Sequence, residues 1–336
     1  MNNSNVINRD AYADALKCLG ILLVIRGHVA LFGLGQTDTY GNIYLLMSYA
    51  FNMPIFFFLS GYYAYKQEMT GQVITKNIKS KFKILVLPAL AFYSYDCLIN
   101  NKPLVTLLEE GFGKFWFTIT LFYVFLIYYA TRAICKSRSR HNATLITLSL
   151  AGIIYLSMFS KYEIPLLDFN HLAKYLQYFV AGIIAKMYNE KYTSLITNQL
   201  LITFATIFFI VMLPIVSQNL LPGIAHKIVR DLLLRYSGTF MIISWFYCCR
   251  NYFAKANSLN RTIAYIGRYT LPIYLLQYFF LPDFSAFSDL TGNIDNITTD
   301  IICSVYTLII TAVCLVFIHL LSNSTFIRKI LFGIKS

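Results

Sequence analysis

Long apolar stretches alternate with short polar segments along almost the whole chain. A helix that crosses a bilayer needs about 20 consecutive, mostly apolar residues, and ten stretches of roughly that length can be marked off. We expect membrane-spanning helices at residues 11–33, 42–65, 82–100, 115–134, 143–159, 171–187, 200–217, 231–249, 262–281 and 301–322. The pattern therefore predicts an all-α, polytopic transmembrane helix bundle of about ten spans, organised as a single membrane domain over residues 1–336.

The composition also favours a membrane protein. Of the 336 residues, 57% are hydrophobic and 13% are charged, whereas a soluble domain carries about 25% charged residues. This balance excludes an ordinary water-soluble protein and a disordered chain. The formal net charge of +13 would suggest a nucleic-acid partner in a soluble protein. Here most basic residues fall between apolar stretches, so we expect a lipid bilayer as partner and no nucleic acid.

The basic residues predict an orientation as well. If the N-terminus lies in the cytoplasm, 18 Lys and Arg residues fall in inner segments and six in outer ones. Because Lys and Arg accumulate on the cytoplasmic side of short loops, both termini are predicted to lie inside. The basic segment at residues 76–83 would then face anionic lipid, with attraction of a phosphorylated donor left open as an additional role.

Four ionisable residues lie in the first apolar stretch. Such side chains are costly inside a bilayer, so by default they face the bundle interior and mark function. Lys17 and His28 are eleven positions apart, which on an ideal helix places them within about 20° of one face and roughly 16 Å apart in height. Asp14 shares that face, whereas Arg26 points the opposite way and would need another partner, such as Asp96. In a simpler interpretation, Asp14 and Lys17 form an interfacial ion pair and His28 is a core histidine.

A further motif follows in the second stretch, where residues 51–63 read FNMPIFFFLSGYY. Together with a basic residue eleven positions before a histidine in the first stretch, it resembles the acyltransferase 3 family of integral-membrane O-acyltransferases. Two later segments agree with that family, namely Phe-Trp-Phe at residues 115–117 and IGRYTLPIYLL at residues 266–276. The resemblance covers essentially the whole chain from Asp14 to the last span.

The chain departs from the family pattern at two positions. The basic residue before the histidine is most often Arg in the family, whereas Lys17 keeps the charge but lacks the bidentate guanidinium. The family often closes its late motif with His, whereas Gln277 can form hydrogen bonds but cannot titrate.

The resemblance implies transfer of an acyl group, with acetyl from acetyl-CoA as the first choice, to a hydroxyl group of a cell-surface polysaccharide or lipid-linked sugar. It also implies the bacterial cytoplasmic (inner) membrane as the location. His28 is expected to be the catalytic base and Lys17 a second catalytic residue that meets the donor, with Asp14 and Arg26 in supporting or orienting roles. The expected donor and acceptor pocket comprises Asn52, Pro54, Phe57, Ser60, Gly61, Tyr62, Trp116, Tyr274 and Gln277.

Several alternatives stay open. The pocket residues would serve equally as helix packing, with Pro54 at a kink and Gly61 at a close helix contact. Direct attack by the hydroxyl and a transient acyl-imidazole are both possible, and succinyl could replace acetyl. A polysaccharide or lipid transporter or flippase would also use buried charge and a broken helix.

Acetyl-CoA is expected as a co-substrate, with no bound cofactor. The seven cysteines are odd in number and lack a C-x2-C pair, so they predict neither a metal site nor a disulfide framework. The other histidines carry no motif. His171 and His319 lie near span ends and are expected to be structural or solvent-facing, and His141 and His226 are expected in loops.

Overall fold

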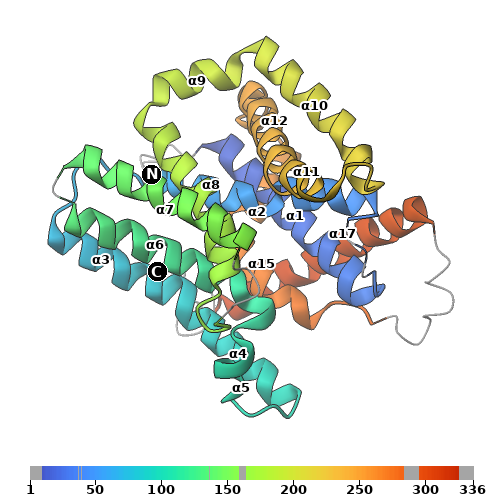
Figure 1. Cartoon of the computed structure of the whole chain (residues 1–336). Helices are drawn as coiled ribbons and strands as arrows, with labels where there is room; N and C mark the ends of the chain where they lie inside the picture. Colours follow the sequence, from blue (N-terminus) through green and yellow to red (C-terminus); the bar gives the residue numbers. More distant parts are fainter. Residues whose placement is uncertain are drawn as a thin grey trace. The chain divides into compact units, whose positions relative to one another are not determined.

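The computed structural model describes residues 10–36, 38, 40–135, 137–158, 164–283 and 295–324 of the chain. All regular secondary structure in these residues is helical (Figure 1), which confirms the prediction of an all-α protein. The chain forms two compact units. The first unit comprises Met1–Phe56 and Asn189–Val316, and the second comprises Phe57–Tyr188 and Phe317–Ser336.

The first unit is built around its N-terminal helix. α1 (Ala11–His28) continues directly into a π-helical turn, η1 (Val29–Gly33), and packs against α12, α14 and α15. A β-carbon at Gly267 of α14 would overlap the backbone oxygen of Asp14, so a glycine is needed where α1 and α14 cross. The other elements that start in this unit are α2 (Ile43–Ala64), α9 (Asn189–Thr197), α10 (Gln199–Ser217), α11 (Gly223–Ile228), η4 (Val229–Leu233), α12 (Leu234–Cys248), α13 (Arg250–Phe253), α14 (Ser258–Arg268), α15 (Thr270–Leu276), η5 (Gln277–Phe279) and α17 (Asn296–Leu321).

In the second unit α6 packs against α3, α7 and α8 (Figure 1). The end of α2 crosses α8 with backbone against backbone, because a β-carbon at Gly61 would overlap Phe179 O and one at Gly182 would overlap Phe58 O. Small residues of this kind let helices approach closely. The elements of this unit are α3 (Gly71–Lys81), η2 (Phe82–Val86), α4 (Leu87–Ile99), α5 (Thr106–Glu110), η3 (Gly113–Phe115), α6 (Trp116–Ile134), α7 (Arg138–Met158) and α8 (Phe169–Met187).

Each of the ten predicted stretches coincides with helical structure, and the first has the predicted bounds, residues 11–33. In the described residues, six helices are long and apolar enough to cross a membrane: Ala11–Gly33, Ile43–Ala64, Gly71–Ile99, Gly113–Ile134, Gln199–Ser217 and Asn296–Leu321. Ten spans and the orientation of the termini stay predictions. The terminal basic residues Arg9, Arg328, Lys329 and Lys335, on which the orientation partly depends, lie outside the described residues.

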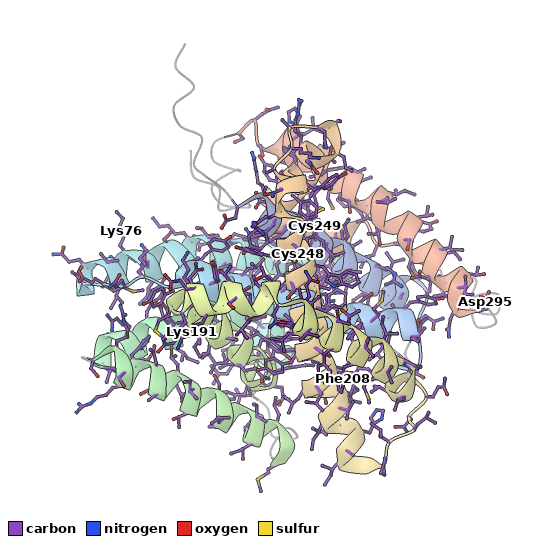
Figure 2. All side chains as sticks on the ribbon, turned by 90° about the horizontal axis from the view of Figure 1, so that it is seen from above. Lys76, Lys191, Phe208, Cys248, Cys249 and Asp295 are labelled. Carbon is purple, nitrogen blue, oxygen red and sulfur yellow. The ribbon has the colours of Figure 1, made fainter. Side chains whose placement is uncertain are left out.

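The surface of α10 is strongly apolar, which suits a helix in lipid. Phe204, Ile207 and Ile210 are exposed, and Phe208 lies on the same helix (Figure 2). Exposed apolar surface of this extent marks contact with a membrane or another apolar partner. The basic segment at residues 76–83 has the opposite character, since Lys76 (Figure 2), Lys79 and Lys83 line one open groove of about 680 Å³ along α3 and η2.

The predicted span at residues 262–281 is not one helix. α14 ends at Arg268, α15 begins at Thr270, and η5 follows from Gln277. Pro272 supplies the physical reason, because its ring conflicts with the carbonyl group of Arg268, four positions earlier, and it has no N–H to donate. The break places Tyr274 and Gln277 on short elements instead of a continuous helix.

Candidate active site

His28 is the last residue of α1 and is half-buried in the first unit. Its Nε2 lies 3.3 Å from the hydroxyl oxygen of Tyr278, and the two rings stack at a tilt with centroids 4.8 Å apart. Phe32, one helical turn further along the chain, packs on the same imidazole at 5.6 Å. The His28 ring therefore contacts the aromatic rings of Phe32 and Tyr278 and the Tyr278 hydroxyl group.

The late motif supplies the polar side of this cluster. Gln277 is fully buried and interacts with His28, while its Nε2 donates to the backbone oxygen of Tyr274 at 3.1 Å. Gln277 Oε1 and His28 Nδ1 are both buried without a well-formed hydrogen bond among the described residues. Buried polar atoms are nearly always hydrogen-bonded, and here the His28 and Gln277 side chains interact with each other.

Two tyrosines complete the cluster. Tyr274 is buried, its ring centroid lies 5.9 Å from that of Tyr278, and it interacts with the Tyr278 hydroxyl. Tyr49 of α2 lies beside Gly27 and close to Tyr278. Tyr278 and Tyr49 were not predicted from the sequence. The one signal for Tyr278 is its place four residues after Tyr274, on the same side of a helical segment.

Lys17 and Asp14 form the ion pair that their spacing allows. Lys17 Nζ lies 3.5 Å from Asp14 Oδ1, and the exposed fractions of the two side chains are 26% and 3%. α1 is uninterrupted between Lys17 and His28, so the two residues keep the predicted separation of roughly 16 Å along the helix. The pair is compatible with both interpretations of Lys17, as an interfacial residue and as a contact for the donor.

The partner suggested for Arg26 is wrong. Arg26 forms an ion pair with Asp300 of α17, and it donates to Ser48 Oγ and, at 3.1 Å, to the backbone oxygen of Tyr44. Asp96 pairs instead with Lys114, with 2.5 Å between Oδ1 and Nζ. Arg26 thus joins α1, α2 and α17. The helix period predicts the direction of its side chain but does not identify the helix that it meets.

The motif of the second span lies on one helix, α2, whose first part belongs to the first unit and whose last part belongs to the second. Asn52 and Pro54 are buried in the first unit, and α2 runs through Pro54 without interruption. In the second unit Gly61 lies at the close crossing with α8, as expected for helix packing, and Tyr62 packs beneath the ammonium group of Lys186 at 4.8 Å. Ser60 is half-buried.

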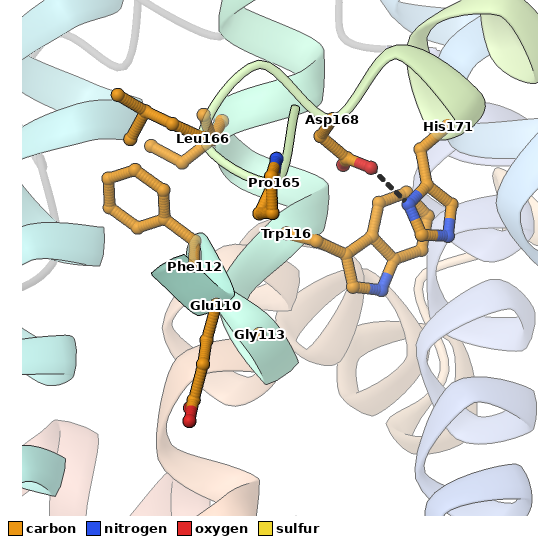
Figure 3. Close-up of a pocket in the computed structure, with 9 residues that line it drawn as sticks. Glu110, Phe112, Gly113, Trp116, Pro165, Leu166, Asp168 and His171 are labelled. Atoms are coloured by element: carbon orange, nitrogen blue, oxygen red, sulfur yellow. Dashed lines mark hydrogen bonds and ion pairs between the residues drawn. The ribbon is translucent and has the colours of Figure 1, made fainter. Parts of the chain in front are cut away.

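Phe57 and Trp116 share an aromatic stack in the second unit. Phe57 is fully buried and lies parallel to Tyr175, with 4.7 Å between ring centroids. Trp116 is parallel to Tyr175 at 5.5 Å and to His171 at 3.8 Å. His171 in turn shares a hydrogen bond of 2.6 Å with Asp168 beside a cavity of about 300 Å³ (Figure 3).

Two of the four expectations for the motif-free histidines, those for His141 and His226, need correction. His171 stacks on Trp116 and pairs with Asp168, which agrees with the structural one of its two expected roles. His141 lies in α7 and is buried, not in a loop. Burial lowers the pKa of His141, and the positive charge of Arg132 lowers it further. His226 lies in the short helix α11.

A comparison with known protein families places these residues in context. The family model Acyl_transf_3, described as an acyltransferase domain, matches residues 10–318 of the chain. No characterised protein and no solved structure matches the chain at a significant level.

Proposed function

The chain belongs to the acyltransferase 3 family, and from this membership we propose that it is an integral-membrane O-acyltransferase that moves acetyl from acetyl-CoA to a hydroxyl group of a cell-surface polysaccharide or lipid-linked sugar. Membership and the apolar helices show a membrane acyltransferase. The acetyl donor, the glycan acceptor and the bacterial inner membrane are parts of the proposal.

The observation that carries the proposal is the environment of His28. Its imidazole lies against the hydroxyl group of Tyr278 and interacts with the side chain of Gln277. A histidine is the side chain whose ordinary pKa suits proton transfer near neutral pH. A general base also has to reach the proton that it removes, and we expect an imidazole nitrogen of His28 to make that contact when the acceptor is bound.

In the proposed reaction a nitrogen of His28 takes the proton of the acceptor hydroxyl as the hydroxyl oxygen attacks the thioester carbonyl carbon. A C–O bond forms, the C–S bond breaks, and the coenzyme A thiolate leaves with the proton that His28 returns to it. The hydroxyl of Tyr278 and the amide group of Gln277 are the hydrogen-bonding groups available to the imidazole and to the developing oxyanion. A transient acyl-imidazole would use the same residues in two steps.

The separation of Lys17 from His28 fits a donor that enters from the cytoplasm. In the predicted orientation Lys17 lies near the cytoplasmic boundary and His28 in the outer half of α1. Acyl-CoA is made in the cytosol, whereas the hydroxyl groups of surface glycans are presented outside. We expect Lys17 to meet the donor and the acyl group to reach His28 along α1.

The acetyl content of the surface polysaccharide tests the proposal. We expect the O-acetyl signals in its NMR spectrum to disappear when the protein is absent or carries His28→Ala. They should persist with His319→Ala, which removes an exposed histidine at the end of α17. Unchanged acetylation together with altered polymer export would overturn the proposal and favour a transporter or flippase, and succinyl signals in place of acetyl would identify a different acyl group.

A further inference from the structure

A second polar cluster lies outside the His28 site, in the second unit. The cavity of about 300 Å³ is lined by residues of α5, the turn before α6, the start of α6 and the segment that leads into α8. Its size is at the lower end of the range for small-molecule pockets, which suits a single ring of a ligand. In the predicted orientation, α6 and α8 both begin on the outer side of the membrane.

The Asp168 carboxylate lies beside this cavity and hydrogen-bonds to side chains. An Asp before a helix normally caps the first turn through its side chain, but Asp168 makes no such bond with α8. Its Oδ1 instead pairs with His171 Nδ1 at 2.6 Å, and its Oδ2 accepts from Thr120 Oγ1 at 2.6 Å. The exposed fraction of the Asp168 side chain is 14%, against 38% for His171. The carboxylate is therefore the more buried partner and fixes the orientation of the imidazole.

This arrangement defines what His171 offers to a ligand. With Nδ1 donating to Asp168, a neutral imidazole keeps Nε2 as a hydrogen-bond acceptor. None of the described residues hydrogen-bonds to that nitrogen. The ring is also fixed by its stack on Trp116, with 3.8 Å between centroids (Figure 3). An oriented acceptor beside a flat aromatic surface is suited to a hydroxylated ring, whose C–H face packs on aromatics while its hydroxyl groups hydrogen-bond.

The charges at the cavity decide between neutral and anionic ligands. The ionisable residues that line it are Glu110, Asp168 and His171, and neither Lys nor Arg is among its lining residues. A phosphate there would meet two carboxylates, while Lys102, which pairs with Glu110 at 3.3 Å, is not itself a lining residue; the repulsion between the phosphate and the carboxylates is therefore only partly offset. The phosphorylated coenzyme A moiety is therefore a poor ligand, whereas a neutral sugar is a suitable one.

We propose that this cavity is an acceptor subsite, in which Trp116 and the Asp168-supported His171 bind one neutral sugar ring of the glycan. The identity of the ligand as the acceptor rests on the proposed function. His171 acts here as a positioning residue that holds a sugar hydroxyl, and His28 remains the proposed base.

The two tryptophans of the chain allow a direct binding test. The variant Trp245→Phe leaves Trp116 as the single tryptophan, so the fluorescence of the full chain in detergent then reports on this cavity. We would titrate it with the methyl glycosides of glucose, galactose, mannose, rhamnose and N-acetylglucosamine, and separately with coenzyme A and inorganic phosphate. We expect a saturable change with at least one glycoside and none with coenzyme A or phosphate.

Substitutions then assign the response to His171. In the Trp245→Phe background, His171→Ala should weaken glycoside binding about tenfold, as expected for a lost hydrogen bond, and His171→Gln, which still offers an acceptor, should weaken it less. His319→Ala is the matched control and should bind like the parent. No saturable response to any glycoside, an equal response in His171→Ala, or a response to coenzyme A would overturn the proposal.

Transfer kinetics separate this inference from the proposed function. With acetyl-CoA and the acceptor glycan, His171→Ala should raise the KM for the glycan about tenfold and leave kcat and the KM for acetyl-CoA unchanged. Transfer that is indifferent to His171 would overturn the subsite and leave the acyltransferase assignment intact. Glycoside binding at Trp116 without any acetyl transfer would instead overturn the proposed function and leave the sugar site intact.

Discussion

Lys17 and His28 lie on one helix but differ in what surrounds them. Lys17 is partly exposed and paired with the buried carboxylate of Asp14, which is an electrostatic environment. His28 lies among Tyr278, Gln277 and Phe32, an environment of hydrogen bonds and aromatic rings. Substitutions at the two positions are therefore expected to affect different steps of the reaction.

The charge of Lys17 is the property that we expect to matter. Lys17→Arg keeps the positive charge and nearly the same reach, so most transfer activity should remain, whereas Lys17→Ala and Lys17→Met should lose it. Acyl-CoA binding to the purified protein should weaken in the two uncharged variants, most clearly at low ionic strength. Equal activity in all three variants would mean that Lys17 serves only its ion pair with Asp14.

His28 is expected to act on the rate and not on donor affinity. His28→Ala should bind acyl-CoA about as well as the parent, while the transfer rate falls by roughly 10²–10⁴, the usual effect of removing a general base. Tyr278→Phe removes only a hydroxyl group and should lower the rate about tenfold. Calorimetric binding and a transfer assay on the same preparations check both outcomes. A His28→Ala variant that still transfers acetyl, or that loses donor binding, would contradict the assignment.

At the scale of secondary-structure elements, glycines determine how closely the helices approach. Gly267 permits the crossing of α14 with α1 beside Asp14, and Gly61 and Gly182 permit the crossing of α2 with α8. Both crossings involve helices that carry candidate site residues. Close packing at these points therefore fixes the backbone positions of the helices that carry the His28 cluster and the Trp116 stack.

Gly182→Ala tests the crossing of α2 and α8. The added methyl group would overlap the backbone oxygen of Phe58, and overpacking of this kind typically costs about 1–3 kcal/mol of unfolding free energy. Gly71→Ala is the matched control, because a β-carbon there meets no atom within 4 Å. Thermal unfolding of both variants in detergent should show a lowered midpoint for Gly182→Ala alone. Equal midpoints would be incompatible with the close crossing.

At the scale of the whole molecule, the uneven distribution of basic residues predicts the orientation. With 18 Lys and Arg residues on the inner side and six on the outer, a reporter fused after Lys335 should be active only in its cytoplasmic form. A second fusion after Lys102, in a predicted outer loop, should be active only in its periplasmic form and serves as the control. A periplasmic signal after Lys335 would rule out ten spans with both termini inside.

Much of this protein could be predicted from its sequence alone. Helices occur at all ten apolar stretches, and the family suggested by residues 14–28 and 51–63 is confirmed over residues 10–318. The pairing of Asp14 with Lys17 also agrees with its spacing. These features depend on local properties, namely hydropathy, helical period and short motifs, which are legible without knowledge of the neighbours.

Only the tertiary structure decided which side chains meet. Arg26 pairs with Asp300 and not with Asp96, Tyr278 joins His28 from a distant segment, and His171 stacks on Trp116. The physical reason is that membrane helices are apolar on most of their surface, so the pattern along one helix does not specify which face meets which partner. The partners are selected by the packing of the folded helices, where a glycine permits contact and an opposite charge or a hydrogen bond completes it.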